Sequence, residues 1–342
     1  MKKHYLIPAV VAWLGACSLS WAVDTIKTTT RATYTGRITQ MSALAVSIDK
    51  NGVVKEVPVN EIEYIVFDGE PSPLNAARSG IRTGRYEDAL EALGRIDLTT
   101  IQRKEILQDI QFFKALCEAR LALAGNGEIK EAGKEMVGFV NAQRDSYHWL
   151  KANEIVGDLL VALRSYAAAQ KYYATVGQAP WPDYKMRAGV ALGRAQLAEG
   201  KTADAMKTFQ SVAAMEGQGE QADYQKLAAT LGQARCLAAE KKYDEAVKIA
   251  EEIIAKADPE ATELNAEAYN TLGTALKKAG KTKDALLAFL HVDVLYFAVP
   301  EAHAEALANL AQLWKEVRKM DRAEQAEQTL VQRYKNSPWA NQ

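Results

Sequence analysis

The 342-residue sequence predicts a mainly α-helical chain, in which about seven helix pairs stack as a solenoid behind a small β module. Two observations predict the solenoid: an alanine recurs every thirty-six to forty-three residues, and apolar residues flank it at helical spacings of three and four. A third observation predicts the β module, because residues 24–68 show β-branched alternation instead. We therefore divide the chain into a signal segment 1–22, a β module 23–69 and a solenoid 70–342.

Residues 1–22 have the pattern of a secretory signal peptide. Lys2 and Lys3 precede an apolar run, and "SWA" at 20–22 offers a small-residue cleavage site. We expect an exported mature chain that begins at Val23, in the periplasm or outside the cell. The alternative is a lipid tether, because "LGAC" at 14–17 resembles the lipobox of bacterial lipoproteins and would make Cys17 the acylated residue.

The charge balance argues against a nucleic-acid partner. The chain has 42 basic and 43 acidic residues, whereas nucleic-acid binding needs a basic patch or stripe. No stretch after residue 22 has the apolar length of a membrane span, so we expect no transmembrane segment in the mature chain. Cys117 and Cys236 fall in separate repeat units and are expected to be buried and unbridged.

The β module contains four or five short predicted strands. The segment 49–52, "DKNG", separates two of them as a hairpin turn does. The pattern resembles a small barrel of the SH3-like or Sm-like type. Because so short a segment has few core residues, we expect it to dock on the first helix pair through the linker "GEPSPLN".

The repeat unit has a small residue, an alanine twelve positions later and a large apolar residue four beyond that, as in Gly273, Ala285 and Phe289. Small residues let two helices approach closely, so each unit is expected to be one helix pair that buries its apolar faces against its neighbours. The alanines are Ala89, Ala132, Ala169, Ala205, Ala246, Ala285 and Ala323. The small residues are Ala77, Gly157, Gly193, Ala234, Gly273 and Ala311, with Arg120 at this position in a looser copy.

This pattern resembles the tetratricopeptide repeat family between about Leu74 and Trp339. The best copy is "AEAYNTLGTALKKAGKTKDALLAFLHV", which matches that family's signature at Tyr269, Leu272, Gly273, Ala285, Phe289 and Val292. Most units are longer than the family's usual repeat, so the superhelix and its groove are expected to depart from the usual shape.

The tripeptide Gly-Lys-Thr occurs twice, at 200–202 and 280–282. A phosphate-binding loop would need a glycine five residues earlier, where this chain has Ala195 and Ala275. Both copies also fall at the same place in the repeat. We therefore interpret them as turns between paired helices.

The sequence shows no catalytic constellation, metal motif or cofactor motif. His148, His291 and His303 do not have zinc-ligand spacing, and paired acids such as those at 251 and 252 occupy consecutive helix positions. We expect a protein that is not an enzyme and holds no cofactor or metal, unless residues distant in sequence converge on a site.

The family resemblance implies a concave surface lined by the first helix of each pair, where a peptide or protein could bind. Its candidate groove residues are Arg187, Arg194, Arg235, Asn270 and Lys277. The alternative for each is a solvated charged face. The aromatic segments 147–150 and 181–184 are candidate anchors or, alternatively, packing between repeats. The expected function is an exported scaffold for proteins or peptides; the alternative is a lipid-anchored factor of envelope assembly or maintenance.

Overall fold

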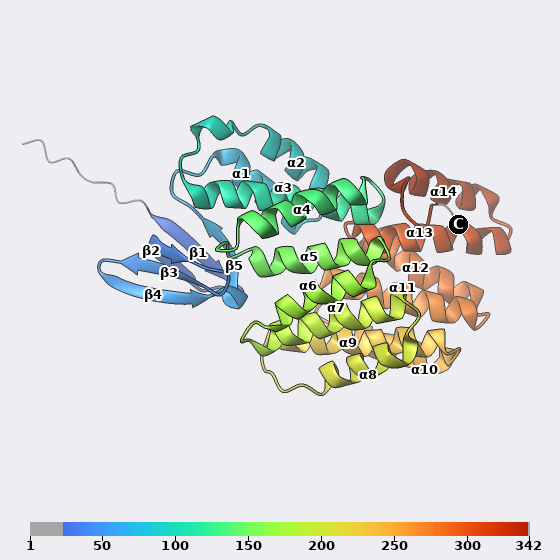
Figure 1. The fold of residues 1–342 in the computed structure, drawn as a ribbon. Helices are drawn as coiled ribbons and strands as arrows, with labels where there is room; N and C mark the ends of the chain where they lie inside the picture. Colours follow the sequence, from blue (N-terminus) through green and yellow to red (C-terminus); the bar gives the residue numbers. More distant parts are fainter. Residues whose placement is uncertain (1–22, 341–342) are drawn as a thin grey trace, which may run out of the picture.

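The computed structural model describes residues 23–340, in which five strands precede fourteen α-helices (Figure 1). This confirms the predicted mainly α architecture with a small β unit in front. The strands are β1 (Asp24–Thr28), β2 (Thr33–Met41), β3 (Ala45–Lys50), β4 (Val53–Pro58) and β5 (Ile62–Val66). The helices are α1 (Ser72–Arg82), α2 (Tyr86–Gly94), α3 (Lys104–Ala124), α4 (Ile129–Ala142), α5 (Trp149–Ala162), α6 (Tyr166–Gly177), α7 (Pro182–Ala198), α8 (Thr202–Ala213), α9 (Glu220–Ala239), α10 (Tyr243–Lys256), α11 (Thr262–Lys278), α12 (Thr282–Leu295), α13 (Pro300–Glu316) and α14 (Met320–Tyr334). The predicted signal segment and Cys17 lie outside the described residues.

The five strands form one antiparallel sheet in the order β4-β3-β2-β1-β5. The predicted hairpin joins β3 and β4: Asn51 and Gly52 both have positive φ, and the Asp49 carboxylate accepts a hydrogen bond from the Gly52 N–H at 2.8 Å. Alternate residues on one face, among them Ile26 and Ile65, are fully buried. These side chains belong to the same apolar cluster as the first helices, so the sheet and the solenoid share one core.

Two buried carboxylates anchor the sheet to the helices. Asp24 is completely buried, accepts hydrogen bonds from the N–H groups of Ile38 and Asp68, and forms a bidentate ion pair with Arg103 at 2.6 and 2.9 Å. Burial alone would raise the pKa of Asp24, but these donors outweigh it and lower that pKa. The second anchor is Glu70, which accepts two hydrogen bonds at 3.0 Å from the buried Arg78 of α1.

The docking surface of the sheet is wider than the first helix pair expected from the sequence. Arg103 precedes α3, and Asn60, between β4 and β5, donates a hydrogen bond to Asp183 of α7 at 3.4 Å. The sheet thus meets helices of the first, second and fourth pairs. The short linker, residues 67–71, indicates contact with the first helix pair only. The wider contact could not be predicted from the sequence, because it depends on how the helices wind.

The helices form seven consecutive antiparallel pairs, from α1–α2 to α13–α14. Every predicted alanine lies on the second helix of its pair and is at most 5% exposed. One residue with positive φ ends the first helix of each pair, as in an αL helix cap. In chain order these residues are Gly84, Gly125, Arg164, Gly200, Lys241, Gly280 and Arg318. The two Gly-Lys-Thr copies therefore occupy turns of this kind.

In three units the small residue is a glycine that makes room for an aromatic ring. Phe209 is completely buried between Gly193 of its own pair and Gly232 of the next, where an added Cβ would approach the ring to 2.6 and 2.5 Å. Phe289 lies against Gly273 in the same way, with an added Cβ only 2.8 Å from the ring. Glycine is thus required because a flat ring packs directly on the helix backbone, and any side chain at this position would displace the ring.

The α3–α4 pair departs from this pattern. Its positive-φ residue, Gly125, lies seven residues before the alanine Ala132, whereas the other six pairs have five. This longer turn moves the small-residue position from Arg120, where the sequence frame placed it, to Glu118. A carboxylate therefore stands where the other pairs have glycine or alanine.

The solenoid closes on itself, so that the last pairs contact the first two. The backbone N–H of Asn336, after α14, donates to the carbonyl of Gly125 at 2.8 Å. A Cβ on Gly84 would lie 2.1 Å from the carbonyl oxygen of Ala298, and α13 packs against α3. Figure 1 shows α13 and α14 beside the ends of α3 and α4. Among residues 23–340, no helix has both the length and the apolar character needed to cross a membrane.

Candidate functional site

The first helices of the pairs carry charged side chains that meet inside the closed solenoid. We call this set the inner charged surface. Its pairs connect helices that are far apart in sequence, and several of its side chains keep contact with water: 42% of the Arg194 side chain and 45% of the Glu301 side chain are exposed. Its members are Arg120, Lys151, Glu154, Asp158, Arg187, Arg194, Arg235, Glu263, Glu267, Glu301 and Glu305.

Helices α5 and α7 supply the most enclosed ion pair. The Arg187 Nε lies 2.6 Å from the Glu154 carboxylate, which is 15% exposed and also pairs with Lys151 at 3.2 Å. Burial alone would raise the pKa of Glu154, but the two cations outweigh it and lower that pKa to about 2. One turn further along α5, burial and the nearby Glu154 raise the pKa of Asp158, although Asp158 accepts a hydrogen bond from the Tyr173 hydroxyl at 2.9 Å.

Two guanidinium groups from different helices contact one carboxylate of α11. Arg194 of α7 contacts the Glu267 carboxylate of α11 at 2.7 Å, and Arg235 of α9 approaches the same carboxylate at 3.6 Å. Arg235 also donates from Nε to the Thr271 hydroxyl at 3.0 Å. Thus two guanidinium groups share one carboxylate, and several of their N–H donors remain for another acceptor.

A further ion pair joins the ends of the solenoid. Arg120 of α3 lies 3.4 Å from Glu301 of α13. Desolvation between the facing helices raises the pKa of Glu301, and Arg120 offsets only part of this effect because Asp158 and Glu263 add negative charge nearby. The two partners therefore have unequal surroundings. Several carboxylates lie near Arg120, whereas the positive charge near Glu301 is too small to offset its desolvation.

Three of the five predicted groove residues, Arg187, Arg194 and Arg235, lie on this surface. The other two mainly connect α11 to α13. Asn270 is completely buried and donates to the backbone carbonyl of Ala302 at 2.8 Å, and Lys277 binds Asn309 at 3.0 Å and also Gln312. Sequence reasoning missed the acidic members altogether. Four of these acids could have been found in the sequence as pairs of glutamates four residues apart, which lie on one face of a first helix. These pairs are at 263 and 267 and at 301 and 305.

The two aromatic segments pack between repeats. Tyr147 is 6% exposed, and the Trp149 indole donates to the carbonyl of Val140 at 2.9 Å. Trp181 and Tyr184 lie edge to face, with ring centroids 5.2 Å apart. These contacts correspond to the packing alternative considered for both segments.

The three described histidines hold helices together. His148 stacks on Phe112 at 3.9 Å and bonds to the buried Asp109 at 2.9 Å. His303 bonds to Tyr334 at 2.8 Å and to Asp293 at 2.9 Å. The exposed His291 stacks on Tyr269. Within residues 23–340, no group of three or more His, Cys, Asp and Glu side chains is placed to hold a metal ion.

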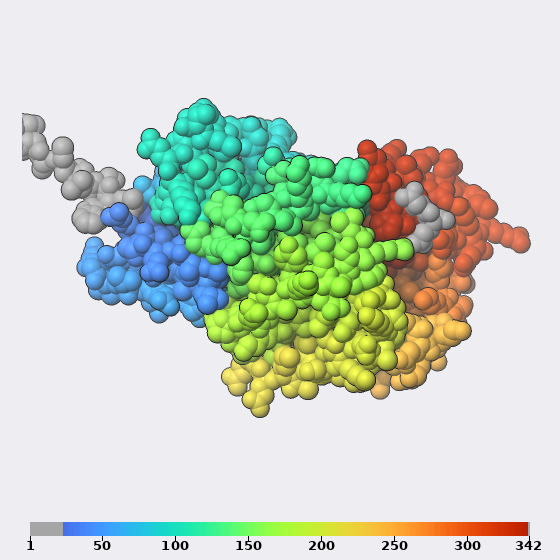
Figure 2. Space-filling model, in the orientation of Figure 1, coloured from blue at the N-terminus to red at the C-terminus, as the bar shows by residue number. Residues whose placement is uncertain are grey.

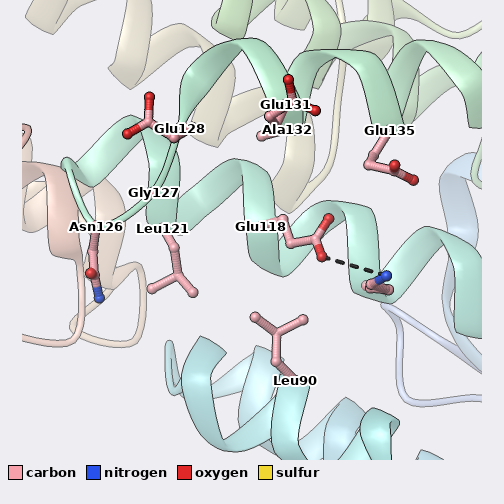
Figure 3. A pocket seen from close by; sticks show the side chains of 10 residues that line it. Leu90, Glu118, Leu121, Asn126, Gly127, Glu128, Glu131, Ala132 and Glu135 are labelled. Atoms are coloured by element: carbon pink, nitrogen blue, oxygen red, sulfur yellow. Dashed lines mark ion pairs between the residues drawn. The ribbon is translucent and has the colours of Figure 1, made fainter.

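A hollow of about 330 Å³ lies at the irregular α3–α4 pair (Figure 3). Leu90 from α2 faces Glu118 and Leu121 from α3, and Glu131 and Glu135 lie on α4. Burial raises the pKa of Glu118, which its ion pair with a lysine one turn earlier offsets in part. Since Glu118 replaces the small residue of the repeat, the hollow follows from incomplete closure of this helix pair.

No protein-family model matches the sequence, and none of the curated proteins matches it by sequence. Solved structures match the fold. A Rap protein in complex with competence and sporulation factor aligns over 77% of this chain and 74% of its own, with a TM-score of 0.55 and 13% identity. A tetratricopeptide repeat protein from Parabacteroides merdae aligns over 76% of this chain and 91% of its own, with a TM-score of 0.44 and 14% identity. At such low identity the likeness concerns the fold alone. The chain thus adopts a tetratricopeptide-repeat-like solenoid fold.

Proposed function

We propose that this chain is an exported, non-enzymatic scaffold that binds a peptide, or an extended segment of a partner protein, on its inner charged surface. The observation that carries the proposal is the sharing of Glu267 by Arg194 and Arg235. The two guanidinium groups remain 42% and 30% exposed, so their contacts with Glu267 leave both partly free for a ligand. The Rap protein of similar fold, which was crystallised in complex with competence and sporulation factor, supports ligand binding on a solenoid of this kind.

A carboxylate is the ligand group that fits these two arginines. Guanidinium groups bind carboxylates through paired, charge-assisted hydrogen bonds, which are stronger than bonds between neutral groups. A peptide C-terminus or an acidic side chain would accept the N–H donors of Arg194 and Arg235 that Glu267 leaves free. The carboxylates of Glu301 and Glu305 on α13 would favour a basic group elsewhere on the same ligand, because Glu305 has no ion-pair partner among the described residues.

The test is a direct binding measurement with a library of fluorescein-labelled pentapeptides that vary one position at a time, followed by fluorescence polarisation. Replacing both Arg194 and Arg235 by alanine should weaken the best peptides at least about tenfold, which corresponds to about 1.4 kcal/mol. The matched control replaces Arg144 and Arg322, two exposed arginines elsewhere, and should bind as the wild type does. If no peptide binds the wild type, or if both double variants bind equally, the proposal is wrong.

Export rests on the sequence of residues 1–22 alone, and we propose the periplasm or the extracellular space. The intact mass of the protein from its host separates the two processing routes. A chain that begins at Val23 supports a free scaffold, and one that begins at an acylated Cys17 supports the lipid-anchored assembly factor.

We propose further that the β module is of the SH3-like type. Its strand order, with a 3₁₀ turn at Val59–Glu61 between β4 and β5, supports this assignment.

A further inference from the structure

The contacts between the two ends of the solenoid form a thin seam, which we call the ring seam. It has three parts: the α1–α2 turn against the α12–α13 loop at Gly84 and Ala298, the α3–α4 turn against the segment after α14, and the Arg120–Glu301 ion pair. Ala124, at the end of α3, also joins the apolar cluster of α13 and α14. The seam thus connects the first two pairs with the last two.

The ring seam requires glycine at two turns, because backbone atoms from the other end of the solenoid approach these turns closely. All seven turns hold a residue with positive φ, and three of these residues are Arg164, Lys241 and Arg318, so the turn itself accepts a side chain. At Gly125, however, an added Cβ would lie 2.0 Å from the backbone nitrogen of Ser337. At Gly84 the distance to the Ala298 carbonyl oxygen would be 2.1 Å. Backbone atoms cannot rotate aside as a side chain can, so these two turns are shaped for closure.

The turns at Gly200 and Gly280 provide an internal comparison. They have φ of +87° and +76°, and an added Cβ at either would meet nothing within 4 Å. A glycine there serves the turn alone, whereas Gly84 and Gly125 serve both the turn and the ring seam.

The ring seam is weaker than the interfaces between consecutive pairs. Those interfaces bury continuous rows of apolar side chains, as the Phe209 contacts illustrate. The seam instead relies on the packing of α13 against α3, a few backbone contacts and an ion pair whose members are 18% and 45% exposed, and such exposed pairs contribute little. Opening the seam leaves every helix pair intact, so we expect it to need less free energy than the separation of two consecutive pairs.

We propose that the ring seam is a latch, whose opening admits the ligand to the inner charged surface. This inference rests on the proposed peptide-binding function. The link between latch and ligand is Glu301, which belongs both to the seam and to the inner charged surface. A basic ligand group bound at Glu301 competes with Arg120, so ligand binding and seam closure are coupled. On the face that Figure 2 shows, the end of the second helix pair, in green, touches the last pair, in red.

The test compares Gly125→Ala and Gly84→Ala with Gly200→Ala and Gly280→Ala, which place the same side chain in the same kind of turn. In the free protein, small-angle scattering should give a larger radius of gyration for the two seam variants only. Hydrogen exchange at the Asn336 amide, which donates to Gly125, should be faster by at least about tenfold in these variants. Circular dichroism should show unchanged helix content in all four.

If Gly125→Ala fails to fold, the comparison rests on Gly84→Ala, which disturbs the other turn of the seam and no residue of the inner charged surface. Equal scattering and exchange in seam variants and turn controls would overturn the latch. Among pentapeptides that bind the wild type, association with an opened variant should be faster by about the closed-to-open ratio. An unchanged association rate would overturn the gating role while the proposed function stands. If the variants open but no pentapeptide binds the wild type, the proposed function fails and the latch has no ligand to admit.

Discussion

Gly193→Ala tests the contact on which the repeat depends. The new Cβ would lie 2.6 Å from the nearest carbon of the Phe209 ring, about 1 Å inside a normal carbon–carbon contact. The ring cannot move away, because its other side already lies against the backbone at Gly232. The ring is so close there that an added Cβ would be only 2.5 Å from it. Overpacking of this kind costs about 1–3 kcal/mol, and alanine recovers about 0.5–1 kcal/mol through its better helix propensity. We expect a net loss of about 1–2 kcal/mol.

Gly138→Ala is the matched control. Gly138 also lies within a helix, but an added Cβ there would meet nothing within 4 Å. The same substitution should therefore stabilise the protein by about 0.5–1 kcal/mol. Urea unfolding followed by circular dichroism measures both changes. If Gly193→Ala also stabilised the protein, the seating of the aromatic ring on glycine would not be what selects the small residue, and the steric argument would be refuted.

Three further substitutions test the packing and the charges. Ala285→Lys should lower the free energy of unfolding by several kcal/mol, because Ala285 is completely buried at a helix–helix contact; an unchanged melting temperature would contradict its anchoring role. Glu154→Gln should reduce stability at neutral pH and flatten its loss in acid. The pKa of Glu154 falls from 4.5 in the unfolded chain to about 2 in the folded protein. Its contribution to the free energy of unfolding is therefore complete above pH 4.5 and disappears as the pH falls toward 2. Urea midpoints that fall equally in both proteins between pH 6 and pH 3 would contradict this. Asp24→Asn should destabilise the protein by about 3 kcal/mol by leaving Arg103 without its buried partner, and faster exchange at the Asp68 amide would locate the damage; wild-type exchange there would exclude the anchoring role.

The repeat could be predicted from the sequence because its cause is local. A ring seated on a glycine, such as Phe289 on Gly273, is encoded by residues sixteen positions apart within one helix pair. The frame failed only where the turn changed length. The α3–α4 turn holds two extra residues, so fixed spacing led to Arg120 in place of Glu118.

Only the basic residues of the candidate site could be predicted from the sequence, and the acidic partners were missed for a different reason. Arg194 and Arg235 could be placed on the concave side because their position relative to the small residue determines which way they face. Their partner Glu267 comes from another pair, and Arg120 finds Glu301 five pairs away. Which helices face each other depends on the rotation between successive pairs, summed around the solenoid, and small changes in each rotation accumulate. No spacing in a single sequence encodes this sum.

Closure also changes how the solenoid is stabilised. In an open solenoid each pair touches only its neighbours, so removing the last pair costs one interface. Here α13 packs both on α11 and α12 and on α3, and the segment after α14 bonds to the turn at Gly125. Removing α13 and α14 therefore costs two interfaces and leaves the cation of Arg120 without Glu301. It follows that the first and last pairs are energetically coupled, so damage in the first two pairs should reach the last two, and the ring should unfold more cooperatively than a linear array of seven pairs.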